Sequence, residues 1–359
     1  MNKTLLFLPD ISGYTAFVQT TEISHSQHVI AELLEVMIEA NTEKLQLAEI
    51  EGDALFFYKE DIPSSEKLLA QIETIFTAFY SHLKLFEKHR ICPCMACSNA
   101  PNLQLKIIAH CGEIEFISVQ NKRKPFGVEV IEVHRLMKNS IESNQYVLLT
   151  DMLKKEIALA ATYQSKLFQL SSGKDSYDGK DIPYSYALID KKKLKLKPFE
   201  QVSKFNFEHA PDVQLQRDFP IGAKDLLEII SNFSYRSKWV EGVDDFVFNP
   251  GEINRLGTEH VCVVNGEHIN FRTITKDVDL IQLVYGELTE TPKLIDTAYQ
   301  FYIITPLKKN TCRLEVEIYM EATSWIKKIM LQFLVKKTFQ INVEKAVNSL
   351  FDFVVNKGK

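Results

Sequence analysis

The sequence predicts an α+β protein built from two domains. In the first half of the chain, strand-like apolar runs alternate with helical patterns, and in the second half several strands precede one long helix. A lysine-rich stretch separates the halves, and 359 residues suit two domains of about 150–200 residues each. We therefore expect a first domain over residues 1–190, a linker over 191–209 and a second domain over 210–359.

In the first domain, short apolar runs predict strands, and stretches with an apolar residue at every third or fourth position predict helices. The strands are expected at residues 4–8, 54–58, 103–110 and 184–189. The helices are expected at residues 28–47, 64–88, 128–139 and 153–161. Alternation of this kind favours helices packed against a sheet.

The second domain has a different order of elements. A strand at residues 213–219 and a short helix at 223–231 begin it. Further strands are expected at 244–248, 259–265, 268–276, 280–288, 298–305 and 312–321, and a long helix at 324–355. A long helix that packs across a curved antiparallel sheet often leaves a cavity between them.

Composition excludes several classes of protein. The net charge of −5 argues against nucleic-acid binding, and no apolar run reaches the roughly 20 residues of a membrane span. Six cysteines do not form a disulfide scaffold, and the N-terminus is predicted to be a strand and not a signal peptide. We expect a cytoplasmic protein. The five lysines of residues 191–197 are interpreted as a solvated linker, with an anionic partner as the alternative.

Two aspartates stand beside strand-like runs, Asp10 after the first and Asp53 before the second. Carboxylates are the ligands that Mg²⁺ prefers, and two of them can hold two divalent ions on a nucleotide's phosphates. The turn after Asp10 contains Gly13 and Thr15, whose backbone N–H groups could bind phosphate oxygens. The alternative is that both aspartates are ordinary turn residues at strand ends.

Five short motifs follow one another in the first domain. They are residues 10–15 (Asp-Ile-Ser-Gly-Tyr-Thr), 52–53 (Gly-Asp), 110–112 (His-Cys-Gly), 127–136 (Gly-Val-Glu-Val-Ile-Glu-Val-His-Arg-Leu) and 179–180 (Gly-Lys). In order and rough spacing, this half of the chain resembles the class III nucleotidyl cyclases, the adenylate and guanylate cyclases. The resemblance implies a ferredoxin-like α/β sandwich, a homodimer, and conversion of a nucleoside triphosphate to a 3′,5′-cyclic monophosphate.

The resemblance also implies roles for individual residues. Asp10 and Asp53 would bind Mg²⁺ or Mn²⁺ with help from the Ile11 carbonyl. Arg135 would stabilise the charge that develops on the phosphates.

Other positions affect the choice of base or depart from the pattern. Glu49 and Lys124 fall near the base-reading positions and could pair with guanine, although both could be ordinary surface charges. The catalytic asparagine of the family is replaced by Ile131, and its phosphate-binding lysine by Asp178. Lys180 or Lys124 could take over that lysine's role.

Residues 89–97 contain a group of soft metal ligands. His89, Cys92, Cys94 and Cys97 could bind Zn²⁺ or an iron–sulfur cluster. The alternative is a reduced cysteine loop without metal. The cyclase family says nothing about this group.

The second domain resembles the START-like, polyketide-cyclase-like superfamily with its helix-grip fold, through its element order, Trp239 and residues 256–258 (Leu-Gly-Thr). The resemblance implies a hydrophobic small molecule bound between sheet and helix. Three hypotheses follow. The chain is a divergent cyclase whose second domain binds an apolar ligand and regulates the first, or it is an inactive pseudo-cyclase scaffold whose ligand-binding work belongs to the second domain. The third hypothesis is a metal or redox sensor at the cysteine group of residues 89–97.

Overall fold

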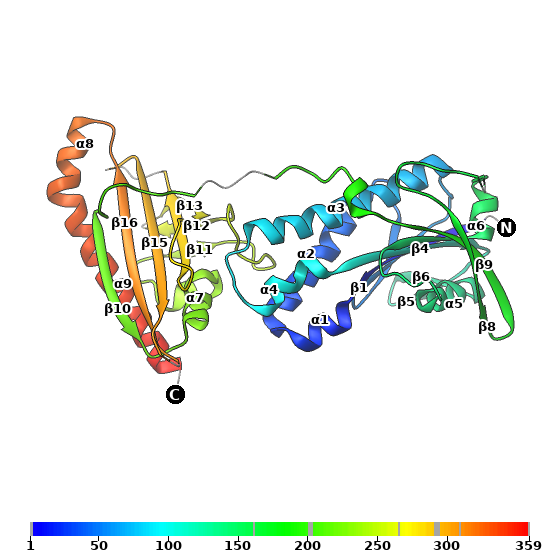
Figure 1. Ribbon diagram of the computed structural model, residues 1–359, viewed down its shortest axis with the longest axis horizontal. Helices are drawn as coiled ribbons and strands as arrows, with labels where there is room; N and C mark the ends of the chain where they lie inside the picture. Colours follow the sequence, from blue (N-terminus) through cyan, green and yellow to red (C-terminus); the bar gives the residue numbers. More distant parts are fainter. Residues whose placement is uncertain are drawn as a thin grey trace. The chain divides into compact units, whose positions relative to one another are not determined.

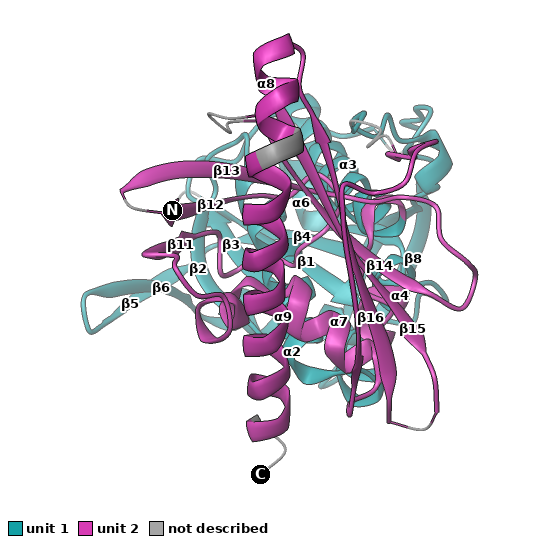
Figure 2. Ribbon diagram, turned by 90° about the vertical axis from the view of Figure 1, so that its left-hand side faces the viewer, with its two compact units in different colours: residues 1–87, 99–199 teal, residues 88–98, 200–359 magenta. Residues whose placement is uncertain are grey.

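The computed structural model describes residues 3–160, 162–199, 204–264, 266–290, 295–308 and 310–357. The chain divides into two compact units, one of residues 1–87 and 99–199 and the other of residues 88–98 and 200–359 (Figure 2). The segment 88–98, expected in the first domain, therefore groups with the C-terminal unit. Residue 161 ends an expected helix, residues 200–203 lie in the expected linker, and residue 265 ends an expected strand. All of them are outside the described residues.

The N-terminal unit is built on a seven-stranded sheet of order β2-β3-β1-β4-β7-β9-β8. Its strands are β1 (Thr4–Ser12), β2 (Gln46–Glu51), β3 (Ala54–Lys59), β4 (Gln104–Gly112), β7 (Tyr146–Thr150), β8 (Ser171–Tyr177) and β9 (Lys180–Leu188). The β4–β7 pair is parallel, and the other neighbours are antiparallel. Strand β1 is buried along its whole length between β3 and β4, so the candidate Asp10 lies inside the sheet and not on a free loop.

Helices cover both faces of this sheet. The α-helices of the unit are α1 (Tyr14–Thr20), α2 (Ile23–Glu39), the long α3 (Ser65–His89, whose last two residues group with the other unit), α5 (Val128–Arg135) and α6 (Asp151–Glu156). Figure 1 shows α2 and α3 on one side of the sheet and α5 on the other. Beneath α5, its Val133 and the following Leu136 pack on Leu6, Leu8 and Ile108 of the sheet. This packing brings Arg135 and its neighbours to the face that carries Asp10.

The prediction of a helix over residues 28–47 was wrong at its C-terminal end. Helix α2 stops at Glu39, because the Asn41 side chain bonds the chain into a turn. Its Nδ2 donates to the Leu45 carbonyl at 2.8 Å, and its Oδ1 accepts the Leu45 N–H at 2.9 Å. Lys44 adopts φ 55 within this turn, a left-handed conformation that a helix cannot include. Strand β2 follows where the helix was expected to continue.

Several polar or short elements were not predicted. The hairpin of β5 (Glu115–Val119) and β6 (Lys122–Phe126) is mostly exposed, and strand β8 is largely polar. Neither has the apolar alternation that marks a strand in a sequence. The lysine-rich stretch is also more structured than expected, since Leu194 is buried and the Lys197 N–H donates to Ser81 Oγ at 2.8 Å.

The C-terminal unit has a second seven-stranded sheet, antiparallel throughout, of order β10-β16-β15-β14-β13-β12-β11. Its strands are β10 (Val213–Phe219), β11 (Asp245–Val247), β12 (Glu259–Val264), β13 (Glu267–Ile274), β14 (Leu283–Thr289), β15 (Thr297–Pro306) and β16 (Cys312–Glu321). Helix α7 (Ala223–Ser231) and the terminal helices α8 (Trp325–Met330) and α9 (Lys336–Lys357), joined by a π-helical turn, complete it. The mixed α+β composition of the chain is confirmed.

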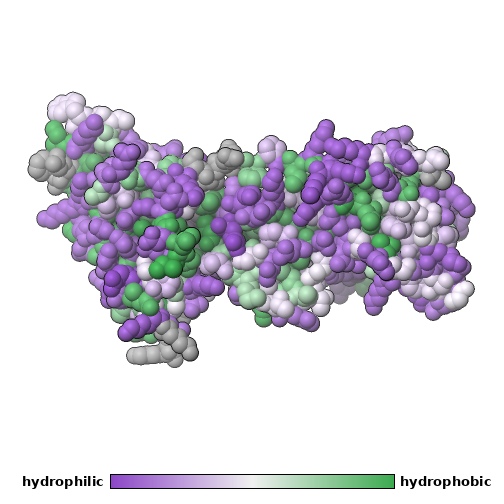
Figure 3. Space-filling view, viewed as in Figure 1, coloured by the Kyte–Doolittle hydropathy of each residue, from purple (hydrophilic) through white to green (hydrophobic). Residues whose placement is uncertain are grey.

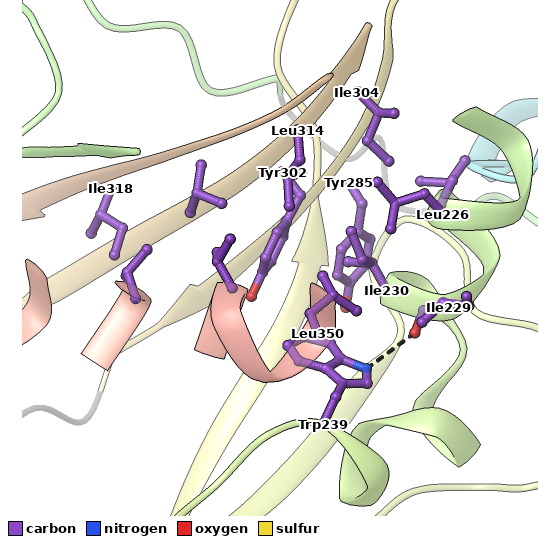
Figure 4. Close-up of a cluster of buried hydrophobic side chains, with 14 of the residues drawn as sticks. Leu226, Ile229, Ile230, Trp239, Tyr285, Tyr302, Ile304, Leu314, Ile318 and Leu350 are labelled. Carbon is purple, nitrogen blue, oxygen red and sulfur yellow. Dashed lines mark hydrogen bonds between the residues drawn. The ribbon is translucent and has the colours of Figure 1, made fainter. Parts of the chain in front are cut away.

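The core of this unit lies between the sheet and helices α7 and α9 (Figure 4). Trp239 is buried there, and its Nε1–H donates to the Ile229 carbonyl at 3.4 Å. A smaller cluster covers the opposite face of the sheet, where Phe207 stacks on Tyr319 with ring centroids 4.0 Å apart. Both faces of the sheet are therefore packed.

The face of the molecule seen in Figure 3 is mainly hydrophilic, with smaller apolar areas on both units. Among the described residues, no helix combines the length and the hydropathy that a membrane crossing requires.

Candidate functional site

Asp10 and Asp53 meet at one end of the N-terminal sheet. Asp10 lies in β1 opposite Ala54 of β3, and the Ile11 N–H donates to the Asp53 carbonyl at 3.1 Å. Gly52, with φ 70, makes the turn that places Asp53 there. Burial, followed by the charge of Asp10, raises the pKa of Asp53 to about 6. Two carboxylates this close repel each other, which is the arrangement that a divalent cation relieves.

Lys106 is a site residue that the sequence reasoning missed. It lies opposite Asp10 in strand β4, and its Nζ is 2.9 Å from Asp10 Oδ2. The same ammonium donates to the Met137 carbonyl at 3.1 Å. Only the pairing of β1 with β4 reveals this residue, because nothing near Lys106 in the sequence marks it. Its positive charge partly compensates the two aspartates.

Ser12 adds an unsatisfied group beside the carboxylates. It is two residues after Asp10, on the same face of β1, and its buried Oγ has no hydrogen-bond partner among the described residues. Buried hydroxyls are normally bonded, so this one suits a ligand oxygen or nitrogen. Gly13, with φ 93, then opens α1, and Thr15 is exposed in its first turn.

The two candidate base readers pair with each other. Glu49 extends from β2 and Lys124 from β6, and Lys124 Nζ donates to Glu49 Oε2 at 2.8 Å. Both side chains are partly exposed. The hairpin of β5 and β6, unforeseen in the sequence, is the element that brings Lys124 to Glu49.

The candidate phosphate-binding cations are also paired within the chain. Arg135 forms an ion pair with Asp178, which has φ 49 in the turn between β8 and β9. Lys180 forms an ion pair with Glu132 of α5. Ile131, on the same helix, has an exposed fraction of 52%. In this arrangement the guanidinium of Arg135 is already paired with a carboxylate.

A second group of polar residues surrounds His110. Its Nδ1 is 2.9 Å from Thr150 Oγ1, and its Nε2 is 2.7 Å from Glu129 Oε2. The hydrogen bond with His110 holds the pKa of Glu129 below its usual range. Glu132, one turn further along α5, completes a group that could hold an ion, at the edge of a cavity of about 320 Å³. Sequence reasoning missed both glutamates, although their three-residue spacing on a helix places them on one face.

The C-terminal unit encloses a cavity of about 420 Å³ between the sheet and α9. The buried Arg236 on its wall forms an ion pair with Glu287, and the Tyr285 hydroxyl donates to Glu287 Oε1 at 2.6 Å. Arg236 Nε is buried and has no hydrogen-bond partner among the described residues. Nearby, burial lowers the pKa of His260 to about 4, so this imidazole is neutral. The opposite wall is apolar, with Val343, Val347 and Leu350 of α9.

The cysteines of the segment 88–98 form a compact group. The sulfur atoms of Cys92, Cys94 and Cys97 lie within 4.8 Å of one another, and no disulfide joins them. The Cys97 N–H donates to Cys94 Sγ at 3.3 Å. Hydrogen bonds with the thiols of Cys92 and Cys94 raise the pKa of Cys97. His89 is buried in the last turn of α3, and its role as a ligand remains a prediction.

Comparison with known sequences finds relatives without an assigned function. A family described as "Protein of unknown function (DUF2652)" matches residues 30–146. The "Uncharacterized protein Rv2561/Rv2562" of Mycobacterium tuberculosis (strain ATCC 25618 / H37Rv) is 32% identical over 124 residues, which are 34% of this chain and 58% of that protein. The chain therefore matches less than two thirds of the length of this curated relative.

Solved structures resemble about half of the chain at low identity. The adenylyl cyclase CyaB from P. aeruginosa has 14% identity and a TM-score of 0.39, over 54% of this chain and 96% of that chain. The guanylate cyclase domain of RhGC from Catenaria anguillulae, in complex with GTP, has 12% identity and a TM-score of 0.38, over 53% and 98%. Hypothetical protein jhp0584 from Helicobacter pylori has 9% identity and a TM-score of 0.34, over 43% and 99%. Likenesses this weak transfer no activity to the chain.

Proposed function

We propose that the N-terminal unit binds a nucleoside triphosphate together with Mg²⁺ or Mn²⁺. The observation that carries this proposal is the meeting of two carboxylates, Asp10 and Asp53, with the pKa of Asp53 raised to about 6. A bound cation would favour the ionised form of both carboxylates. The alternative is that both aspartates are ordinary turn residues at strand ends. That alternative does not explain why a carboxylate pair is buried beside a Ser12 hydroxyl that has no hydrogen-bond partner among the described residues.

The donor set fits a hard divalent cation. Asp10, Asp53 and the Ile11 carbonyl offer oxygen atoms, and phosphate oxygens and water would complete the coordination. When bound, the metal neutralises triphosphate charge and favours in-line attack at phosphorus. Lys106 holds Asp10 in place, and its ammonium provides a further positive charge for a phosphate oxygen at this edge.

The groups around the carboxylates suit the remaining parts of a nucleotide. The Ser12 hydroxyl and the backbone N–H groups after Gly13 would bind phosphate oxygens. Glu49 could accept from N1–H and N2–H of guanine, and Lys124 could donate to its O6. Because the two side chains already form an ion pair at 2.8 Å, a guanine would exchange that pair for equivalent bonds to its own edge. We therefore expect GTP to bind more tightly than ATP.

A second copy of the chain is the proposed partner. Apolar side chains with exposed fractions between 40% and 63% gather on β2, β6 and α5, namely Leu47, Ile50, Phe126, Val128 and Ile131. Both β2 and α5 contact β6, so these residues belong to one region of the unit. Exposed apolar groups of this kind mark association surfaces. In a homodimer, Ile131 would be covered, which explains an apolar residue where the cyclases carry asparagine.

The C-terminal unit is proposed to bind a hydrophobic small molecule in a START-like, helix-grip cavity. Its volume of about 420 Å³ is in the range of ligand pockets. The charges of Arg236 and Glu287 cancel, and His260 is neutral. We therefore expect an uncharged apolar molecule whose hydroxyl or carbonyl oxygen accepts from Arg236 Nε, and not a carboxylate.

The second candidate function is that of a pseudo-cyclase, which binds nucleotide or only dimerises without turnover. The ion pair of Arg135 with Asp178 favours it, because the cation expected to stabilise the reacting phosphates is already neutralised. The test is incubation of the purified chain with ATP, GTP, CTP and UTP in Mn²⁺, with products read by mass spectrometry. A cyclic monophosphate identifies an enzyme and its base. Bound but unconverted triphosphate identifies the pseudo-cyclase, and absence of both product and binding contradicts the nucleotide proposal.

A further inference from the structure

The three cysteines of the segment Lys88–Ser98 take no part in the proposed nucleotide site. Their sulfur atoms lie within 4.8 Å of one another, and no disulfide joins any of the chain's six cysteines. We propose that Cys92, Cys94 and Cys97 bind one Zn²⁺ ion in a structural site, with a histidine as the fourth ligand.

Local structure explains why the sulfurs converge. Cys94 caps the short helix α4 (Met95–Asn99), because its Sγ accepts the Cys97 N–H at 3.3 Å and its carbonyl accepts the Ser98 N–H at 3.0 Å. Cys94 and Cys97 therefore lie on one turn. Pro93 fixes the backbone between Cys92 and Cys94. The guanidinium of Arg90 donates to the Ser98 hydroxyl and closes the loop, so the group is held before any ion binds.

The spacing and the ligand type select the ion. Zn–S bonds of about 2.3 Å in a tetrahedron separate the sulfurs by about 3.8 Å, so sulfurs already within 4.8 Å need only small movements. In a 4Fe–4S cluster each thiolate binds a different iron, which requires wider spacing, and in a 2Fe–2S cluster each iron takes only two protein ligands. Mg²⁺ and Ca²⁺ prefer oxygen ligands. Three converging thiolates thus favour Zn²⁺.

The fourth ligand is a histidine by the same reasoning. Four histidines of the described chain are buried. His110 pairs with Glu129, and His260 lies 3.5 Å from Glu287. Within the segment itself, His89 is buried three residues before Cys92, and it is the candidate. Three cysteines and one histidine form a complete structural zinc site.

A bound zinc ion would stabilise residues 88–98, which belong to a different unit from the residues on either side of them in the sequence. Residues 88–98 come from the first half of the sequence but group with the C-terminal unit. Within that unit, the Leu256 N–H donates to the His89 carbonyl at 2.8 Å, and Arg90 pairs with Arg255 as an isolated bridge. The segment is short, and the helix α4 is its main regular element. Bound zinc would therefore add to the free energy that keeps it folded.

The test measures metal in the full chain, purified without added nucleotide, so its result is independent of the nucleotide proposal. Elemental analysis is expected to find one zinc per chain. After removal by a chelator, Co²⁺ is expected to give the thiolate charge-transfer bands of a tetrahedral site, and Zn²⁺ to displace it. Cys94→Ser, whose side chain is only half-buried, is expected to lose more than the 10–100-fold in affinity that loss of an outer partner costs.

Matched controls and contrary outcomes make the test decisive. Cys262→Ser and Cys312→Ser remove buried cysteines elsewhere in the same unit and are expected to retain one zinc. His89→Ala is expected to change the cobalt spectrum, and an unchanged spectrum overturns the histidine ligand. A chain that binds neither Zn²⁺ nor Co²⁺, that contains iron and sulfide, or that has a disulfide within the segment contradicts the proposal.

Discussion

The pKa of the Asp53 carboxyl group distinguishes a metal-binding site from an ordinary turn. Its pKa is raised to about 6, first by burial and then by the charge of Asp10. Between about pH 4 and 6 the folded chain holds a proton here that the unfolded chain has lost. Ionisation of this group therefore costs stability as the pH rises through that window.

Asp53→Asn is expected to raise the stability of the N-terminal unit at pH 7.5 and to have little effect at pH 4. The gain should be about 1 kcal/mol, because a half-buried carboxylate is partly screened by water. That corresponds to about 2–4 °C in melting temperature. Thermal melts at both pH values, without divalent metal, measure it. Equal melting temperatures of the two proteins at pH 7.5 would contradict a strained carboxylate pair.

At Arg135 the expected change is a gain of function. Asp178→Ala removes the carboxylate paired with Arg135, and Ile131→Asn introduces the asparagine that the resemblance to cyclases implies at this position. The double variant is expected to bind triphosphate about tenfold more tightly than the natural chain, because charge-assisted bonds to phosphate are strong. We also expect it to form a cyclic product. Asp61→Ala, which removes an exposed carboxylate after β3, is the control and should change neither property.

Among the elements, several with a strong apolar pattern were predicted well, although the buried strand β7 was missed. Helix α7 and strands β10 and β16 have the predicted bounds, because their alternation or helical periodicity continues to their ends. The end of α2 was missed because the Asn41 turn depends on two side-chain hydrogen bonds and not on hydropathy. The β5–β6 hairpin was missed because its residues are mostly exposed and carry no core pattern.

Strand β14 offers a test of how tightly the second sheet is packed. Gly286 pairs with Phe301 of β15, and a Cβ at that position would lie 2.6 Å from Phe301 Cδ1. Gly286→Ala is therefore expected to destabilise the C-terminal unit by about 1–3 kcal/mol. Gly251→Ala, where the nearest atom is Asn249 Oδ1 at 3.5 Å, should be nearly neutral. Chemical unfolding measures the stability of both variants. Similar unfolding midpoints would show that the sheet accommodates the added methyl group at position 286 without loss of stability.

At the scale of the whole molecule, the sequence predicted two α+β domains. It did not predict that residues 88–98 group with the C-terminal unit. That assignment depends on backbone bonds such as Leu256 to His89, which join residues far apart in the sequence. The same limit applies to the candidate site. Asp10 and Asp53 were proposed from motifs, whereas Lys106 and Glu287 become visible only when strands and helices meet.

Association is the prediction that belongs to the assembled molecule. Ile131→Glu and Val128→Glu place charge on the exposed apolar side chains of α5 and are expected to convert a dimer into monomers. Light scattering after gel filtration measures the mass. Ile326→Glu, on exposed α8 of the other unit, is the control and should leave the dimer intact. If the natural chain is already monomeric at tens of micromolar, the homodimer proposal is wrong.

The central claim is that Asp10 and Asp53 hold a divalent cation on a triphosphate. The most direct measurement is electron paramagnetic resonance of Mn²⁺ titrated into the chain with a non-hydrolysable GTP analogue. We predict a bound Mn²⁺ signal that requires the analogue, is lost in Asp53→Asn and is retained in Asp61→Asn. A bound signal that is unchanged in Asp53→Asn, or no bound Mn²⁺ in the natural chain, would contradict the account.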